Sequence, residues 1–142
     1  MDKKYLFDTN IISEYTRKIP NLQVVSLVEQ NYKQACISSV TYFESLRGIL
    51  SMNEGRRKMM FLDYFDSCVR YRYDIVPYDS AIADINASFF SVLTNQGKVP
   101  SLPDSMIAAT ALANNLTLVT RNVKDFKFIQ EVAPLKIENW FE

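Results

Sequence analysis

The stretch that decides the fold is Tyr5-Leu6-Phe7-Asp8-Thr9-Asn10, near the start of the 142-residue chain. An apolar run ends there in an acidic residue, and a helical pattern begins at once, from about Ile11. This pattern is typical of a buried parallel strand that delivers a carboxylate to the carboxyl-terminal edge of a sheet. We therefore expect Asp8 to lie at that edge, with chemistry that depends on the side chains that meet it there.

Short apolar runs alternate with helical patterns along the whole chain. Strands are expected at 4–7, 35–38, 74–76, 117–120 and 135–137. Helices are expected from 11 to just before 20, at 22–28, 40–52, 56–70, 79–95 and 104–114, with a loop at 96–103 and a turn or short helix at 124–130. This alternation predicts an α/β fold in which helices cover both faces of a parallel sheet. Without a linker or repeat, the length indicates a single domain, 1–142.

The composition excludes several kinds of chemistry. The chain has no histidine, which excludes Ser-His-Asp and Cys-His nucleophilic sites, His-ligated zinc and histidine-based ribonuclease chemistry. Its three glycines, at 48, 55 and 97, cannot form a P-loop or a G-x-G-x-x-G fingerprint. Carboxylates remain, and they are the ligands that hard cations such as Mg²⁺ or Mn²⁺ prefer.

Charge and cysteine content indicate the environment of the protein. The formal net charge is zero, from 16 basic and 16 acidic side chains, so nucleic acid must be bound by local basic clusters. The two cysteines, Cys36 and Cys68, lie in apolar patterns and suit buried, reduced thiols in a cytoplasmic protein. We expect no signal peptide and no membrane span, since no apolar run approaches about 18 residues.

Four polar positions can reach the carboxyl-terminal edge of the predicted sheet, and a fifth, Asp125, lies three residues after the last of them. The four are Asp8 after the first strand, Glu44 in the helix after the second, Asp104 at the start of the alanine-rich helix, and Asn122 after the strand 117–120. Together they favour a metal site, because carboxylates brought together repel one another and a divalent cation relieves that cost.

Each of these residues also has a purely structural interpretation. Asp8 could accept hydrogen bonds from the helix that follows, and Glu44 could complete a capping box with Thr41 or lie on a solvated helix face. Asp104 could favour the dipole of its helix. Asp125 could cap a short helix, and Asn122 could be an ordinary turn residue.

Four motifs that contain these residues resemble the PIN-domain family, in particular the VapC-type toxins of bacterial toxin–antitoxin systems. In chain order they are FDTNIISE at 7–14, ISSVTYFESLRG at 37–48, PDSMIAATA at 103–111 and LVTRNVKDF at 118–126. The resemblance covers essentially the whole chain and keeps the order and spacing of the family.

The resemblance implies a PIN-like fold with strand order 3-2-1-4-5, which would bring Asp8 beside Asn122. It also implies an endoribonuclease that depends on Mg²⁺, for which Mn²⁺ could substitute. Asp8 and Asp104 would be the principal metal ligands, and Glu44 would complete the acidic cluster. Many relatives carry aspartate at the position of Asn122, which can still coordinate through its carbonyl oxygen; Asp125 is a candidate to compensate for the missing charge.

RNA, a cognate antitoxin and a second copy of the chain are the expected partners. The phosphates of RNA need cations, for which Arg47, Arg121 and Lys124 lie near the proposed edge. The apolar excess of the helices between 40 and 73 could face a homodimer partner or an antitoxin. Two alternatives remain open: a PIN-like module that binds RNA or protein without cutting it, and a phosphatase of the haloacid dehalogenase type. The second would want an acid where this chain has Asn10.

Overall fold

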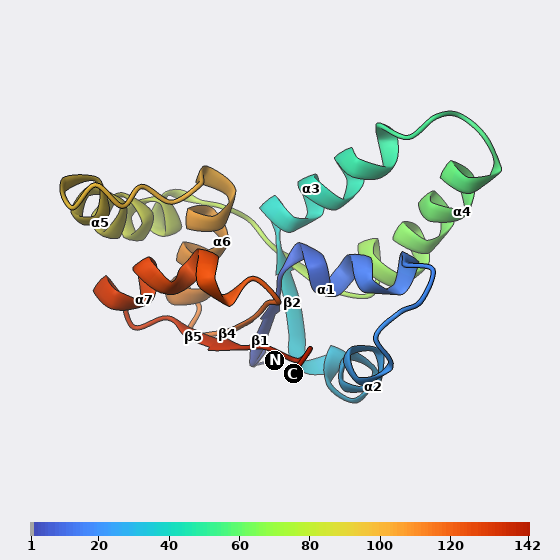
Figure 1. Ribbon diagram of the computed structural model, residues 1–142, viewed down its shortest axis with the longest axis horizontal. Helices are drawn as coiled ribbons and strands as arrows, with labels where there is room; N and C mark the ends of the chain where they lie inside the picture. Colours follow the sequence, from blue (N-terminus) through green and yellow to red (C-terminus); the bar gives the residue numbers. More distant parts are fainter. Residues whose placement is uncertain (1) are drawn as a thin grey trace.

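A five-stranded parallel sheet forms the centre of the computed structural model, which describes residues 2–142 (Figure 1). The strands are β1 (Tyr5–Phe7), β2 (Ala35–Ser38), β3 (Asp74–Val76), β4 (Thr117–Val119) and β5 (Lys136–Glu138). Their order is β3-β2-β1-β4-β5, which confirms the predicted α/β fold and strand order. Because β1 pairs in parallel with both β2 and β4, the residues that follow these strands reach the same edge.

Helices cover both faces of the sheet. Those on one face are α1 (Thr9–Ser13), α2 (Leu22–Asn31), α3 (Ser39–Leu50) and α4 (Arg56–Phe65), and those on the other are α5 (Ser80–Asn95), α6 (Leu102–Ala113) and α7 (Lys127–Val132). Short 3₁₀ turns lie at Glu14–Thr16, Tyr32–Gln34 and Val123–Phe126, and a π-helical turn at Asp66–Arg70. Figure 1 shows α5, α6 and α7 on one side of the strands and α1, α2 and α4 on the other.

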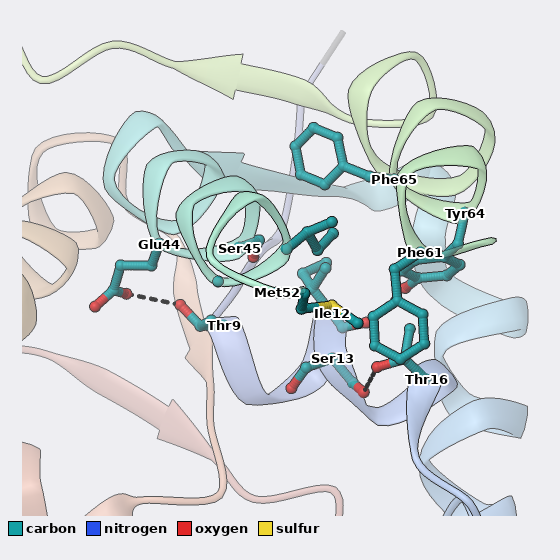
Figure 2. Close-up of a pocket in the computed structure, with 12 residues that line it drawn as sticks. Thr9, Ile12, Ser13, Thr16, Glu44, Ser45, Met52, Phe61, Tyr64 and Phe65 are labelled. Carbon is teal, nitrogen blue, oxygen red and sulfur yellow. Dashed lines mark hydrogen bonds between the residues drawn. The ribbon is translucent and has the colours of Figure 1, made fainter. Parts of the chain in front are cut away.

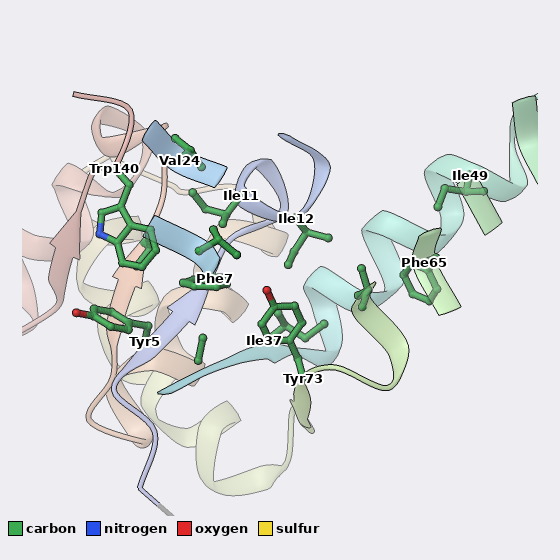
Figure 3. Packing of buried hydrophobic residues seen from close by; sticks show 14 residues of the cluster. Tyr5, Phe7, Ile11, Ile12, Val24, Ile37, Ile49, Phe65, Tyr73 and Trp140 are labelled. Carbon is green, nitrogen blue, oxygen red and sulfur yellow. The ribbon is translucent and has the colours of Figure 1, made fainter. Parts of the chain in front are cut away.

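The central strand β1 divides the core into two clusters. Tyr5 and Phe7 point to the face of α1 and α2, and Leu6 points to the face of α5 and α6, as the alternation of side chains along a strand requires. Phe7 makes T-shaped contacts with two aromatic rings, Tyr73 at 5.7 Å and Trp140 at 5.3 Å between ring centres (Figure 3). A strand buried on both faces therefore places Asp8 rigidly at its end.

Several element boundaries differ from the sequence-based expectation. Helix α6 begins at Leu102 behind the cap Ser101, so Pro103 lies in the first helical turn and not in the preceding loop. A proline is tolerated there because the N–H groups of the first turn have no partner within the helix. The helix expected at 56–70 is α-helical to Phe65 and then widens into the π-helical turn.

The two cysteines are free thiols, as predicted. Cys36 is buried, and burial raises the pKa of its thiol to about 11. Cys68 is only half-buried, which is less than its apolar surroundings in the sequence suggested. Among the helices of residues 2–142, none combines the length and the apolar character needed to cross a membrane.

The aromatic core around β1 should dominate the stability of the fold. Phe7 is fully buried, whereas the Phe43 side chain is 60% exposed, so the same substitution can be compared at both positions. We expect Phe7→Ala to lower the free energy of unfolding by about 3–5 kcal/mol, because it leaves a cavity. Phe43→Ala should change it by about 0.5 kcal/mol or less. Urea denaturation of both variants measures this; equal losses would contradict the assignment of the core.

Candidate active site

Asp8 is fixed by its backbone and by three donors to its side chain. Its N–H donates to the Val119 carbonyl oxygen at 3.0 Å, which continues the pairing of β1 with β4. Its carboxylate Oδ1 accepts from the Thr9 N–H at 2.7 Å and so caps α1. Its Oδ2 accepts from Thr120 Oγ1 at 2.7 Å and from Asn10 Nδ2 at 3.3 Å. Asp8 therefore caps the helix, as its structural interpretation expected, but only Oδ1 takes part in the cap.

The carboxyl group of Asp8 lies in an unfavourable electrostatic environment. Burial raises its pKa above the ordinary value, and the hydrogen bonds from Thr120 and Thr9 lower it. The negative charges of Asp104 and Glu44 raise the pKa further. Side chains from three elements far apart in the sequence thus act on one another at this edge.

Glu44 reaches the site from α3. The N-cap of this helix is Ser38, whose hydroxyl accepts from the Thr41 N–H at 2.9 Å. The structural alternative of a capping box between Thr41 and Glu44 is therefore wrong. The carboxylate of Glu44 instead accepts from Thr9 Oγ1 at 2.8 Å (Figure 2). Thr9 therefore touches two acidic side chains, Asp8 through its N–H and Glu44 through its hydroxyl.

Asp104 lies in the first turn of α6, half-buried, where its N–H donates to Ser101 Oγ at 3.2 Å. Burial raises the pKa of Asp104, the hydroxyl of Ser101 lowers it, and the charges of Asp125 and Glu44 raise it. Asp125 thus joins the acidic group. It lies inside the 3₁₀ turn Val123–Phe126 and does not cap it.

Asn122 follows β4, and its N–H donates to Thr120 Oγ1 at 3.1 Å. Its side chain is exposed and does not cap the turn that follows. The amide of Asn122 has no fixed partner among the described residues. The charge of Asp125 acts on Asp104 nearby.

Two of the three basic residues singled out from the sequence are held by neighbouring groups. The guanidinium of Arg47 lies 5.7 Å from the centre of the Phe43 ring, and its side chain lines a cavity of about 400 Å³ together with Glu44. The backbone N–H of Arg121 donates to Asn10 Oδ1 at 3.1 Å. Lys124 lies in the 3₁₀ turn after Asn122 and is exposed.

The donor set fits a hard divalent cation. The available atoms are carboxylate oxygens, which Mg²⁺ and Mn²⁺ prefer. The six ion pairs found in residues 2–142 leave Asp8, Glu44, Asp104 and Asp125 without a cationic partner. In the same range, however, no three acidic, histidine or cysteine side chains are gathered into a closed metal-binding group. The acidic side chains therefore bring negative charge to this edge, without being gathered closely enough to hold a metal ion as they stand.

Sequence reasoning missed the polar residues that orient the acids. Thr9, Asn10 and Thr120 all lie within the quoted motifs, but none was assigned a role. Two signals could have found them: Thr9 and Asn10 directly follow Asp8, and Thr120 directly follows the neighbouring strand. A hydroxyl at the end of a strand beside a buried carboxylate is a natural donor to it.

The fold and the acidic edge define an α/β protein whose carboxylates gather where the strand order reverses. The chain belongs to the PIN domain family, whose model matches residues 5–131. It is 31% identical over 137 residues to the tRNA(fMet)-specific endonuclease VapC of Shigella flexneri, which covers 96% of this chain and 98% of the relative.

Solved structures show the same similarity. FitAcB from Neisseria gonorrhoeae superposes with a TM-score of 0.87 at 28% identity, covering 97% of this chain and 99% of the other. A toxin–antitoxin complex from Klebsiella pneumoniae superposes with a TM-score of 0.62 at 29% identity, covering 94% of this chain and all of the other. The resemblance to VapC-type toxins stated from the motifs is thereby confirmed.

The hydroxyl of Thr120 should stabilise the ionised form of Asp8. Thr120→Val removes this donor at a buried position, and we expect it to cost about 1–3 kcal/mol of unfolding free energy at neutral pH. The pKa of Asp8 in the folded protein is already raised, and the variant raises it further. The cost should therefore shrink as the pH falls through this raised pKa, because protonated Asp8 depends less on the donor.

Thr110→Val provides the matched control. Thr110 is equally buried, but its hydroxyl donates to the Met106 carbonyl oxygen at 2.7 Å, which does not titrate. Urea denaturation in EDTA, at neutral pH and near the ordinary aspartate pKa, measures both costs. If the two variants show the same dependence on pH, Thr120 does not act on the charge of Asp8.

Proposed function

We propose that this protein is a metal-dependent endoribonuclease that acts as the toxin of a toxin–antitoxin pair, with residues 1–142 working as one PIN domain. The observation that carries the proposal is the coupling of Asp8, Glu44 and Asp104 at the edge of the sheet in a chain of this family. The endonuclease activity named for the Shigella flexneri relative supports the reaction class. The free thiols favour action in the cytoplasm.

Asp8 and Asp104 would be the principal ligands of Mg²⁺ or Mn²⁺. Glu44, held by Thr9, would complete the set directly or through water, and Asp125 would add charge beside Asp104. When bound, the cation would supply Lewis-acid chemistry, by lowering the pKa of water and offsetting negative charge on a phosphate. Mg²⁺ usually keeps several water molecules, which agrees with the open arrangement of these side chains.

The other residues have supporting roles in the proposed hydrolysis of RNA phosphodiester bonds. Thr9 and Thr120 hold the carboxylates of Glu44 and Asp8 by their hydroxyl groups, so that little reorganisation is needed when the substrate arrives. Asn122 would orient water or offer its carbonyl oxygen. Arg47, Arg121 and Lys124 would bind substrate phosphates, because a polyanion must be drawn to an edge that is itself negative.

The proposed protein partners are an antitoxin and a second copy of the chain. An apolar pocket of about 260 Å³ lies between α1, α3 and α4, beside Thr9 and Glu44 (Figure 2). The similar structure from Klebsiella pneumoniae is a toxin–antitoxin complex, which supports an antitoxin as a partner, and the pocket is where we propose that it binds. On the outer side of α3, Phe43 and Leu50 are exposed, and exposed apolar groups of this kind favour a protein interface, here a homodimer.

One observation keeps a second function in consideration. Asn122 replaces an acid, and the acidic side chains of residues 2–142 do not form a closed metal-binding group. A PIN-like module that binds RNA or protein without cutting would also have these features. A phosphatase of the haloacid dehalogenase type is not favoured, because Asn10 stands where that chemistry needs an acid and its amide is bonded to Asp8 and to the Arg121 N–H.

Cleavage of RNA in the presence and absence of metal tests the proposal. We expect the purified, antitoxin-free protein to cut a mixed RNA pool with Mg²⁺ or Mn²⁺ and not with EDTA. Asp104→Asn should remove the cutting, because it removes a principal ligand. Asp84→Asn, the same change at an exposed position on α5, should leave it intact.

Stability measured on the same proteins separates the remaining outcomes. Without metal, Asp104→Asn should raise the melting temperature slightly, because it removes one of the repelling charges. With metal at 100 times its Kd, the wild type should gain about 2.7 kcal/mol and the variant much less. Metal binding without cleavage would favour the binding module. If the protein shows neither metal binding nor cleavage, the proposed metal site is rejected.

Either Asp125 or Asn122 could be the fourth residue, besides Asp8, Glu44 and Asp104, that contributes to metal binding. Because the charge of Asp125 acts on Asp104, we expect Asp125→Asn to weaken Mg²⁺ binding several-fold, and Asn122→Ala to weaken it less. Asn122→Asp should tighten binding by adding a negative charge. Calorimetric titration with Mg²⁺ measures all three. A larger loss for Asn122→Ala than for Asp125→Asn would assign the position to the amide.

A further inference from the structure

Arg121 stacks on an aromatic ring without an ion pair among the described residues, as Arg47 and Arg57 also do. Its guanidinium carbon lies 4.9 Å from the centre of the Phe141 ring. Arg70 and Arg72 also lie over rings, but each is bonded to a carboxylate as well. None of the six ion pairs within residues 2–142 involves Arg121. Its guanidinium is therefore held by one face, while no carboxylate occupies its N–H donors.

The Phe141 ring belongs to a segment that is fastened to the core independently of Arg121. The neighbouring Trp140 is buried, with its ring in T-shaped contact with Phe7 (Figure 3). Gln23 Nε2 donates to the carbonyl oxygens of Trp140 at 3.0 Å and Glu142 at 2.8 Å, on both sides of Phe141. Phe141 itself packs against the same core cluster as Phe7. The position of the Phe141 ring is thus fixed without Arg121, and the long Arg121 side chain can pack against it.

The backbone of Arg121 is tied to the candidate active site. It follows β4, and its N–H donates to Asn10 Oδ1 at 3.1 Å. The same amide group donates from Nδ2 to Asp8 Oδ2 at 3.3 Å. Two hydrogen bonds through one side chain therefore connect Arg121 to the central carboxylate, while Phe141 fixes the other end of the residue.

We propose that Phe141 is a positioning residue, whose ring holds the Arg121 guanidinium at the rim of the acidic edge to bind an RNA phosphate. Stacking covers the face of the guanidinium and leaves the donors in its plane, which suit a phosphate. It also restricts the side chain before binding, so that less freedom is lost when RNA binds. The inference rests on the proposed ribonuclease function, since it takes RNA as the ligand.

Binding of RNA to a set of variants tests this role. All the proteins carry Asp104→Asn, so that RNA stays intact in Mg²⁺. The probe is a short fluorescein-labelled single-stranded RNA of random sequence, followed by fluorescence anisotropy over a range of salt concentrations. The variants are Phe141→Leu, Arg121→Ala and the two combined, with Phe141→Tyr to restore an aromatic face. Lys136→Ala removes one positive charge at the opposite edge of the sheet, where β5 begins.

We expect Phe141→Leu to weaken RNA binding about two- to fivefold, the effect of losing an exposed cation–π contact. Phe141→Tyr should bind as the parent does. Arg121→Ala should lower the slope of log Kd against log salt by about 0.7, which corresponds to one phosphate on a single strand. Once Arg121 is alanine, Phe141→Leu should have no further effect. Lys136→Ala should keep the parental slope.

An equal effect of Phe141→Leu with and without Arg121 would overturn the proposal and make Phe141 a purely structural residue. An unchanged salt slope in Arg121→Ala would overturn it as well. If Phe141→Leu lowers the melting temperature, Phe141→Met replaces it in the same cycle. Without the Asp104 change, Phe141→Leu should raise KM for RNA cleavage and leave kcat unchanged. If the protein without the Asp104 change neither cuts nor binds RNA, the proposed function fails. If it does cut or bind RNA, but the effects of Phe141→Leu and Arg121→Ala on RNA binding are independent, only this inference fails.

Discussion

The negative charge of Asp8 at the end of β1 is the constraint on which the rest of the structure depends. A buried carboxylate is costly unless it is hydrogen-bonded or paired with a cation. Here three protein donors approach it, while two further acids act on it and none of the ion pairs in the described range relieves them. Such an arrangement is stable only if the surrounding structure holds it, and a bound cation, as we propose, would make it favourable.

The fold meets this constraint through its topology. Strand β1 lies at the centre of the sheet between β2 and β4, at the switch point where α/β proteins bind ligands. The strand itself is buried on both faces, so the aromatic packing of Phe7 with Tyr73 and Trp140 fixes the position of its end. Helix α3 then brings Glu44 and helix α6 brings Asp104 from opposite layers. Strand β1 thus contributes to stability through the packing of its side chains, and to the proposed chemistry through the carboxylate at its end.

Much of this could be predicted from the sequence, because the pattern of apolar runs fixes the strands and the acids fall just after them. The strand order came from the resemblance of the motifs and not from periodicity. What the sequence could not give were contacts between distant segments: the hydrogen bond from Thr9 to Glu44, the cap at Ser38 in place of Thr41, and the action of Asp125 on Asp104. These depend on how α3, α6 and the turn after β4 settle against β1, which no local pattern encodes. The stacking of Arg121 on Phe141 is equally non-local.

The central claim is that a divalent cation binds among Asp8, Glu44 and Asp104. Anomalous diffraction from crystals soaked in Mn²⁺ tests it most directly, because it locates the ion without relying on activity. The account predicts one strong peak at the carboxyl-terminal edge of the sheet, within coordination distance of Asp8 and Asp104, and no such peak in crystals of Asp104→Asn. A fully soaked crystal with no peak at this edge, or with its strongest peak elsewhere, would contradict it.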